Sequence, residues 1–301
     1  MSKRYCAGCR KAITGIHVTA LSGYWHAECF CCASCRAPIR ESNFIVKEGR
    51  PYHTQCHRAL YGIRCYLCSG YIEGHYLTHH WGKFCYRHRN DRRCNACDKF
   101  LIAGGVALSD GRSYCKDCQV SAVIVGSDVE RQRRIVTPFL NTLGINVKTD
   151  IAIDLCGKNH PDFTGDKLGL TRTVTESRNG KVVARTVRSI GVLSHLPSLQ
   201  FDMVLVHEHY HVWEHRHGLS SGMKISEGMA ELLAWIYVAQ NGGDRDLAVL
   251  LKQGIEQRKD AIYGAGFRVA RRAMARYGLS ELLKRVRQGK SIATFLDISR
   301  D

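Results

Sequence analysis

The chain has 301 residues, of which 45% are hydrophobic, and a formal net charge of +17. This length leaves room for two or three domains and one sizeable core. The sequence contains no run of 18 apolar residues, which argues against a membrane-spanning helix, and its N-terminus lacks the apolar stretch of a signal peptide. We therefore expect a cytoplasmic protein with no membrane partner, whose thiols stay reduced.

The cysteines are concentrated in the first part of the chain: 14 of the 15 precede residue 119. Most stand in CxxC or HxxC pairs, which in a reducing compartment indicate metal ligands rather than disulfides. Residues 1–60 hold two quartets, Cys6, Cys9, His26 and Cys29, then Cys32, Cys35, His53 and Cys56. This spacing suits two tetrahedral zinc ions and resembles the LIM double zinc finger. Cys31 stands outside the pattern, and we expect a packed free thiol there.

A second, LIM-like module occupies residues 61–122. Its quartets are Cys65, Cys68, Cys85 and His88, then Cys94, Cys97, Cys115 and Cys118. This module departs from the LIM pattern because its Cys85–His88 pair reverses the usual order and because five residues, not two, join the quartets. The sequence thus predicts four structural zinc ions. Three histidines between the ligand pairs, His75, His79 and His80, are expected to be exposed loop residues.

The positive charge is spread along the chain. Residues 1–120 carry 18 Lys and Arg against 8 Asp and Glu, and binding of four zinc ions by thirteen thiolates removes about five charges of this surplus. A nucleic-acid-binding protein would concentrate its basic residues in one stripe. The distribution therefore argues against a nucleic-acid partner.

Residues 123–301 have a different composition and read as a separate α+β domain. Ser127 and Glu130 fit a capping box that opens a helix, which Pro138 would limit or kink. Alternating apolar and polar residues predict strands within 146–155, 170–177 and 181–193, with a turn at 178–180. We expect the strand through Arg185–Leu193 to be an edge strand that pairs with an extended substrate.

The segment HEHYH at 207–211 predicts a catalytic zinc site. On a helix that starts near Pro197, His207 and His211 lie one turn apart and project from one face. Glu208 beside them can take a proton from a metal-bound water. The competing interpretation is a His-rich amphipathic helix without a metal, since the stretch also holds His209, His215 and His217.

Glu227 is the preferred third ligand, since it opens a second helical run, EGMAELLAWIYVA. His217 has the spacing of another zinc-peptidase class, but that class needs Gly where Glu214 stands here. Glu231, one turn after Glu227, is expected to accept a hydrogen bond from His207 or His211. Its alternative is a solvated surface carboxylate. The chain then ends in three helical segments within 244–260, 265–278 and 279–289, with Gly278 stopping the second.

From Cys6 to about Gly289 the sequence resembles the DA1 family of ubiquitin-linked peptidases. The resemblance rests on the two finger modules, on VLSHLPSLQFDMVLVHEHYHVW and ISEGMAELLA, and on IYGAGFRVARRAMARYGL. It implies a zincin-like metallopeptidase with His207, His211 and Glu227 on the catalytic zinc and Glu208 as the base. Within IYGAGFR, Tyr263 and Arg268 are candidate oxyanion donors, the alternative being packing and a surface charge. Plant members carry ubiquitin-interacting motifs before the LIM domain, and we expect none here.

Three functions follow as expectations. The first is a zinc-dependent endopeptidase acting on protein substrates, with ubiquitin or ubiquitinated proteins as the partners that the resemblance suggests. In that case the finger modules serve protein recognition or regulation. The second is a LIM-type adaptor with a decayed peptidase domain, against which the intact His207, Glu208, His211 and Glu227 set argues. The third, a zinc-finger nucleic-acid binder, disagrees with the LIM-like spacing and the modest charge of the fingers.

Overall fold

The computed structural model describes residues 3–79, 81–101, 104–146, 151–178, 181–219, 221–243 and 246–289. His80 and the tip of the predicted turn at 179–180 lie outside these residues. Contacts divide the chain into two compact units, Met1–Asp91 and Arg92–Asp301. The division falls inside the predicted module 61–122, so the two zinc quartets of that module lie in different units.

Unit 1 is built from short antiparallel hairpins, each beside a zinc quartet. The LIM module contains β1 (Val18–Ala20), β2 (Gly23–Trp25), β3 (Phe44–Lys47), β4 (Arg50–His53) and α1 (Thr54–Tyr61). The following half-module contains β5 (Tyr76–His79), β6 (Gly82–Cys85) and the 3₁₀ helix η1 (Tyr86–Asn90). A small core around Phe30, Ile39 and Tyr52 fills the LIM module. With so little apolar core, these hairpins depend on metal ligation for stability.

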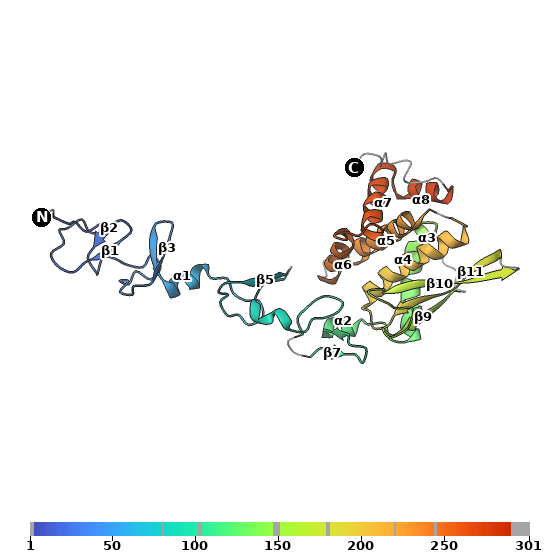
Figure 1. Cartoon of the computed structure of the whole chain (residues 1–301), viewed down its shortest axis with the longest axis horizontal. Helices are drawn as coiled ribbons and strands as arrows, with labels where there is room; N and C mark the ends of the chain where they lie inside the picture. Colours follow the sequence, from blue (N-terminus) through green and yellow to red (C-terminus); the bar gives the residue numbers. More distant parts are fainter. Residues whose placement is uncertain are drawn as a thin grey trace. The chain divides into compact units, whose positions relative to one another are not determined.

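Unit 2 begins with one half-finger, made of β7 (Val106–Ala107), β8 (Ser113–Tyr114) and α2 (Lys116–Val120). The α+β domain that follows contains α3 (Gly126–Thr142), β9 (Ala152–Cys156), β10 (Gly169–Arg178), β11 (Lys181–Leu193) and α4 (Ser198–Arg216) (Figure 1). The helices α5 (Met223–Asn241), α6 (Asp246–Glu256), α7 (Tyr263–Tyr277) and α8 (Leu279–Arg287) complete it. Tandem zinc modules followed by a small sheet with helices confirm the predicted α+β class.

The sheet has the strand order β10-β11-β9. Strand β11 pairs antiparallel with β10 and, over Ser189–Leu193, parallel with β9. The expectation that the strand through Arg185–Leu193 is a free edge was therefore wrong. The hairpin places β10 outermost, on the side where Gly169 packs against α4: a Cβ on Gly169 would lie 2.4 Å from Val204 Cγ1.

Helix α3 begins at Gly126, two residues earlier than the predicted capping box of Ser127 and Glu130 requires. The carboxylate of Asp128, not of Glu130, accepts hydrogen bonds from the backbone N–H groups of Ile124 and Val125. Pro138 lies inside α3, and the helix continues to Thr142 past it. At the other end of the domain Gly278 has a φ of +75° between α7 and α8, a conformation that favours glycine.

Helix α4 is the centre of the core of unit 2. It contacts α3, α5, β10 and β11, and Phe201, Leu205 and Tyr210 are fully buried along it. A helix that is apolar around most of its circumference is buried, with neighbouring elements packed around it. Its polar residues therefore stand in fixed positions, which is what a metal site on this helix requires.

Candidate metal centre and active site

Five clusters of His, Cys and Glu side chains bring their ligand atoms together within 4.8 Å among the described residues. Four of them are the predicted quartets of Cys and His residues. Several pairs of ligand atoms lie 3.3 to 3.9 Å apart, for example Cys9 Sγ to His26 Nδ1 at 3.3 Å and Cys68 Sγ to Cys85 Sγ at 3.8 Å. A tetrahedron with zinc–sulfur bonds of about 2.3 Å has edges of about 3.8 Å. The quartets thus fit zinc.

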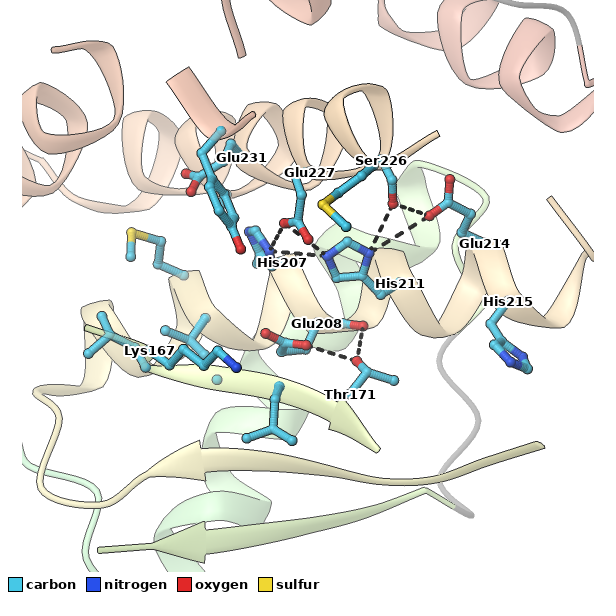
Figure 2. Close-up of a pocket in the computed structure, with 18 of the residues that line it drawn as sticks. Lys167, Thr171, His207, Glu208, His211, Glu214, His215, Ser226, Glu227 and Glu231 are labelled. Carbon is cyan, nitrogen blue, oxygen red and sulfur yellow. Dashed lines mark hydrogen bonds and ion pairs between the residues drawn. The ribbon is translucent and has the colours of Figure 1, made fainter. Parts of the chain in front are cut away.

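The fifth cluster joins His207 and His211 of α4 to Glu227 of α5 (Figure 2). The Nε2 atoms of the two histidines are 3.2 Å apart, and Glu227 Oε2 lies 3.2 Å from His207 Nε2 and 3.4 Å from His211 Nε2. Zinc bonds of about 2.0–2.1 Å to nitrogen and oxygen give tetrahedral edges of about 3.3 Å. Two imidazoles and one carboxylate with these spacings fit three corners of a zinc site.

The three groups also match a cation electrostatically. Burial alone would raise the pKa of the Glu227 carboxyl, but hydrogen bonds from the two imidazoles lower that pKa to about 2. Burial alone would lower the pKa of His211, but hydrogen bonds to Glu214 and Glu227 raise it to about 10. The carboxylates around His211 therefore favour positive charge, and a metal ion bound there would replace the imidazole proton.

Glu208 lies beside the cluster and faces the edge strand. Only 5% of its surface is exposed, and Thr171 Oγ1 donates a hydrogen bond of 2.8 Å to its Oε2 (Figure 2). A Cβ on Gly169 would lie 2.9 Å from Glu208 Oε1. Strand β10 therefore fixes the carboxylate from one side, next to the cluster, where a base for a metal-bound water belongs.

The carboxylate that supports His211 is Glu214. Ser226 Oγ lies 3.3 Å from His211 Nδ1 and donates a hydrogen bond to Glu214, whose Oε2 lies 3.8 Å from the same Nδ1. Ser221 donates to the other oxygen of Glu214. This arrangement orients the ring and directs Nε2 toward the cluster.

Glu231 does not take the role expected from the sequence. Arg258 donates a hydrogen bond to Glu231 Oε1, and the pair closes another part of the pocket wall. Glu231 is 6% exposed, so it is not a solvated surface carboxylate either. Glu231 lies one helical turn after Glu227 on α5. Its side chain faces Arg258 and Tyr263 rather than the two histidines.

The cluster opens into a cavity of about 820 Å³. Its walls come from β10, α4, α5 and the start of α7, and they include Leu170, Met203, Leu219, Met223 and Tyr263. Burial, and then the charge of Glu227, raise the pKa of the Tyr263 hydroxyl, so it stays a donor. Arg268 lies outside the lining and donates instead to the backbone carbonyl of Arg258 at 2.7 Å.

His209 and His217 of the same segment have ordinary helix-backbone partners. His209 is buried on the opposite side of α4 and pairs through Nδ1 with the Leu205 carbonyl at 2.7 Å, and burial lowers its pKa to about 4. His217 Nδ1 pairs with the Trp213 carbonyl at 2.8 Å. His217, the alternative third ligand, is therefore bonded to the backbone of α4, whereas Glu227 contacts both imidazoles.

Sequence reasoning missed Thr171, Glu214, Ser226 and Arg258. At the level of the sequence, Glu214 counts only as evidence against the motif that includes His217. Its spacing of three residues from His211 is nevertheless compatible with a contact between the two side chains on one helix face. Thr171 and Arg258 approach from other elements, and nothing in their local sequence marks them.

Comparisons with known proteins agree with this architecture. A LIM domain model matches residues 6–61. LIM domain-containing protein HDR3 of Oryza sativa subsp. japonica is 27% identical over 94% of this chain and 73% of that protein. Protein DA1 of Arabidopsis thaliana is 26% identical over 95% of this chain and 67% of that protein. The resemblance to the DA1 family is confirmed.

The chain is thus a LIM-containing relative of the DA1 proteins. A shorter similarity, 34% identical over 38% of this chain and 22% of the other protein, relates it to PDZ and LIM domain protein 7 of Bos taurus. Among the described residues, no helix is long and apolar enough to cross a membrane.

Proposed function

We propose that the chain is a zinc-dependent endopeptidase. The observation that carries this proposal is the convergence of His207, His211 and Glu227 at tetrahedral spacing with Glu208 beside them, all facing one open cavity. Three protein ligands leave a fourth position for water, as a catalytic zinc requires. In structural zinc sites protein side chains occupy all four positions, as in each finger quartet.

A zinc ion held by these three residues would lower the pKa of its bound water and polarise a scissile carbonyl. In this proposal Glu208 would accept the proton of that water and later deliver it to the leaving amine. Thr171 holds one oxygen of Glu208, which fixes the carboxylate in the cavity wall that also carries the cluster. Tyr263 and Arg258, both lining the cavity, can donate to the oxyanion, and Arg258 replaces Arg268 in this role.

Within the described parts of the chain, β10 pairs only with β11, so its outer edge is open to an extended substrate. The N–H of Leu193 donates to the Leu168 carbonyl, and bonded and non-bonded pairs alternate in antiparallel strands. The backbone groups of Gly169 and Thr171 therefore point away from β11, along the cavity wall. A polypeptide paired there would run past the metal cluster in both directions, which favours cleavage within a chain.

For partners we propose protein substrates, with ubiquitin and ubiquitin conjugates as the first to test, because the DA1 resemblance implies a ubiquitin-linked peptidase. The finger modules would then recruit or regulate, since LIM modules bind proteins and carry no chemistry of their own. A cytoplasmic location agrees with the reduced state that the zinc thiolates need. The match of residues 6–61 to the LIM domain also supports the second candidate, an adaptor that binds proteins without cleaving them.

The test is cleavage of ubiquitin conjugates, and of the chain itself, by the wild-type protein and by Glu208→Gln. We expect the substitution to keep all zinc ions and to slow cleavage by roughly 10²–10⁴-fold. Binding of the same conjugates without cleavage by the wild-type protein, across a broad peptide library as well, would favour the adaptor.

A further inference from the structure

The fourth zinc quartet lies in the same compact unit as the metal cluster of α4. Cys94, Cys97 and Cys118 are buried there, and Cys118 belongs to α2. The third quartet, although part of the same sequence module, lies in unit 1. The fourth quartet therefore shares a compact unit with α4, whereas the third belongs to the other unit.

The chain leaving the fourth quartet is hydrogen-bonded to the segment that enters α4. Three residues after Cys118, the carbonyl of Ser121 accepts a bond of 2.8 Å from the N–H of Ser198, the first residue of α4. The N–H of Val123 donates to the Leu196 carbonyl, and the N–H of His195 donates to the Val123 carbonyl, both at 2.9 Å. Residues 121–123 thus form a short paired segment with 195–198.

A buried arginine makes a second connection. Arg112, 7% exposed, stands just before β8, two residues from Tyr114 and three from the ligand Cys115. Its guanidinium donates to the Ser194 carbonyl at 2.7 Å, to Tyr114 Oη at 2.9 Å and to the Asp110 carboxylate at 2.7 Å. Asp110 in turn accepts from the N–H of Lys158 at 3.3 Å.

These bonds are costly to lose because they are screened from water. The buried Arg112 guanidinium pairs with the Asp110 carboxylate and the Ser194 carbonyl. If one of these partners moves away, the guanidinium and that partner both lose a hydrogen bond that water does not replace. Val123 and Tyr114 are almost completely buried next to them. The half-finger consequently shares its interior with the domain that carries the metal cluster, and its position depends on the four ligands that close its loops.

We propose that the fourth zinc quartet is a positioning element of the peptidase domain, which fixes the entry of α4 through Ser121–Val123 and Arg112. His207 and Glu208 follow two to three turns into that helix. The first three quartets have no such role. The consequence for cleavage rests on the proposed function, whereas the structural connection does not.

The experiment compares two double substitutions in the full chain. Cys115→Ser with Cys118→Ser removes the fourth zinc, and Cys68→Ser with Cys85→Ser removes the third as the matched control. Native mass spectrometry verifies that each variant lacks one structural zinc. Hydrogen–deuterium exchange of peptides from 195–211 and retention of the α4 metal against a chelator are then measured.

We expect the fourth-quartet variant to exchange at least roughly tenfold faster at 195–206, and to lose the α4 metal at a lower chelator concentration. The control should match the wild type in both measurements. Equal protection of 195–206 in the two variants would overturn the proposal. A second variant, Arg112→Met, keeps all four zinc ligands and so separates the proposal from a failure of the half-finger to fold. It should show the same faster exchange at 195–199. Unchanged exchange there would also overturn the proposal.

None of these readouts requires turnover. If the wild-type protein cleaves nothing, the proposed function fails while the exchange comparison still decides the present inference. If cleavage is present, the positioning role predicts that Arg112→Met lowers kcat and metal retention together. Added zinc then restores part of the rate, which a loss of substrate binding by the fingers would not reproduce.

Discussion

Gly228 and Gly266 pack backbone against backbone where α5 crosses α7. A Cβ on Gly228 would lie 2.3 Å from the carbonyl carbon of Gly266, and a Cβ on Gly266 would lie 3.0 Å from the α-carbon of Gly228. Gly228 directly follows Glu227, the acidic member of the α4–α5 cluster. The close approach of α5 to α7 therefore helps to set where that carboxylate stands beside α4.

Substituting Gly228→Ala should destabilise unit 2, because the new methyl group meets backbone that cannot move aside. We expect a loss of roughly 1–3 kcal/mol in the free energy of unfolding, measured by urea denaturation followed by tryptophan fluorescence. Gly254→Ala is the matched control: Gly254 lies in α6 with nothing within 4 Å of an added Cβ. That change should be neutral or stabilising by about 0.5–1 kcal/mol. Equal effects would mean that the helix crossing is not tight.

The support of His211 by Glu214 predicts a second difference. Glu214→Gln should weaken zinc binding at the α4 cluster roughly 10- to 100-fold, because the ring loses its charged orienting partner. Glu231→Gln should leave that affinity nearly unchanged, since Glu231 pairs with Arg258. Competition with a chelator of known affinity measures both. A larger effect from Glu231→Gln would return Glu231 to the role that the sequence predicts.

The hydrogen bond from Thr171 to Glu208 predicts an effect on rate without one on metal content. Thr171→Val keeps the shape of the side chain and removes the donor, so Glu208 loses its fixed orientation. We expect kcat to fall by roughly tenfold, as the loss of one hydrogen bond to a charged group implies. Thr173→Val, a change on the same strand, serves as the control. Zinc loss in Thr171→Val would show that the residue acts on the metal site instead.

The five clusters predict five zinc ions per chain, counted by native mass spectrometry. Glu227→Ala should lower the count to four, since two imidazoles alone bind zinc weakly. Chelation at neutral pH should remove the same ion first, because thiolate-rich quartets hold zinc more tightly. A wild-type count of four that is unchanged by Glu227→Ala would remove the metal from α4 and favour the adaptor.

The metal ligands could be found from the sequence because their spacing is local. Two cysteines separated by two residues, or two histidines one helical turn apart, reach one ion whatever the rest of the chain does. Glu227 could be predicted for a related reason. Only a short turn separates α4 from α5, so α5 returns along α4 and carries Glu227 to the two histidines. The extents of β10, β11 and α4 were likewise visible in the periodicity and the flanking Pro and Gly residues.

The edge strand and the partners of Glu231 and Arg268 could not be predicted from the sequence, because they depend on contacts between elements that are distant along the chain. The parallel pairing of β9 with β11 decides which strand is the edge, and no local pattern encodes it. The positions of Glu231 and Arg268 were mistaken because helix periodicity gives the face of a residue but not the neighbour that occupies that face. Arg258, in the segment between α6 and α7, supplies that neighbour through its side chain for Glu231 and through its backbone carbonyl for Arg268.

The open edge of β10 also bears on how the protein behaves at high concentration. An unpaired strand edge offers its backbone groups to any extended chain, including another molecule of the same protein. Strand β10 shifts register between Arg172 and Thr173 and again between Glu176 and Ser177, and such irregularities twist an edge and interrupt its ladder. The first shift comes directly after Arg172, one residue beyond Thr171. The regular part of the free edge is therefore confined to a few residues beside the cavity, which limits self-association by sheet extension.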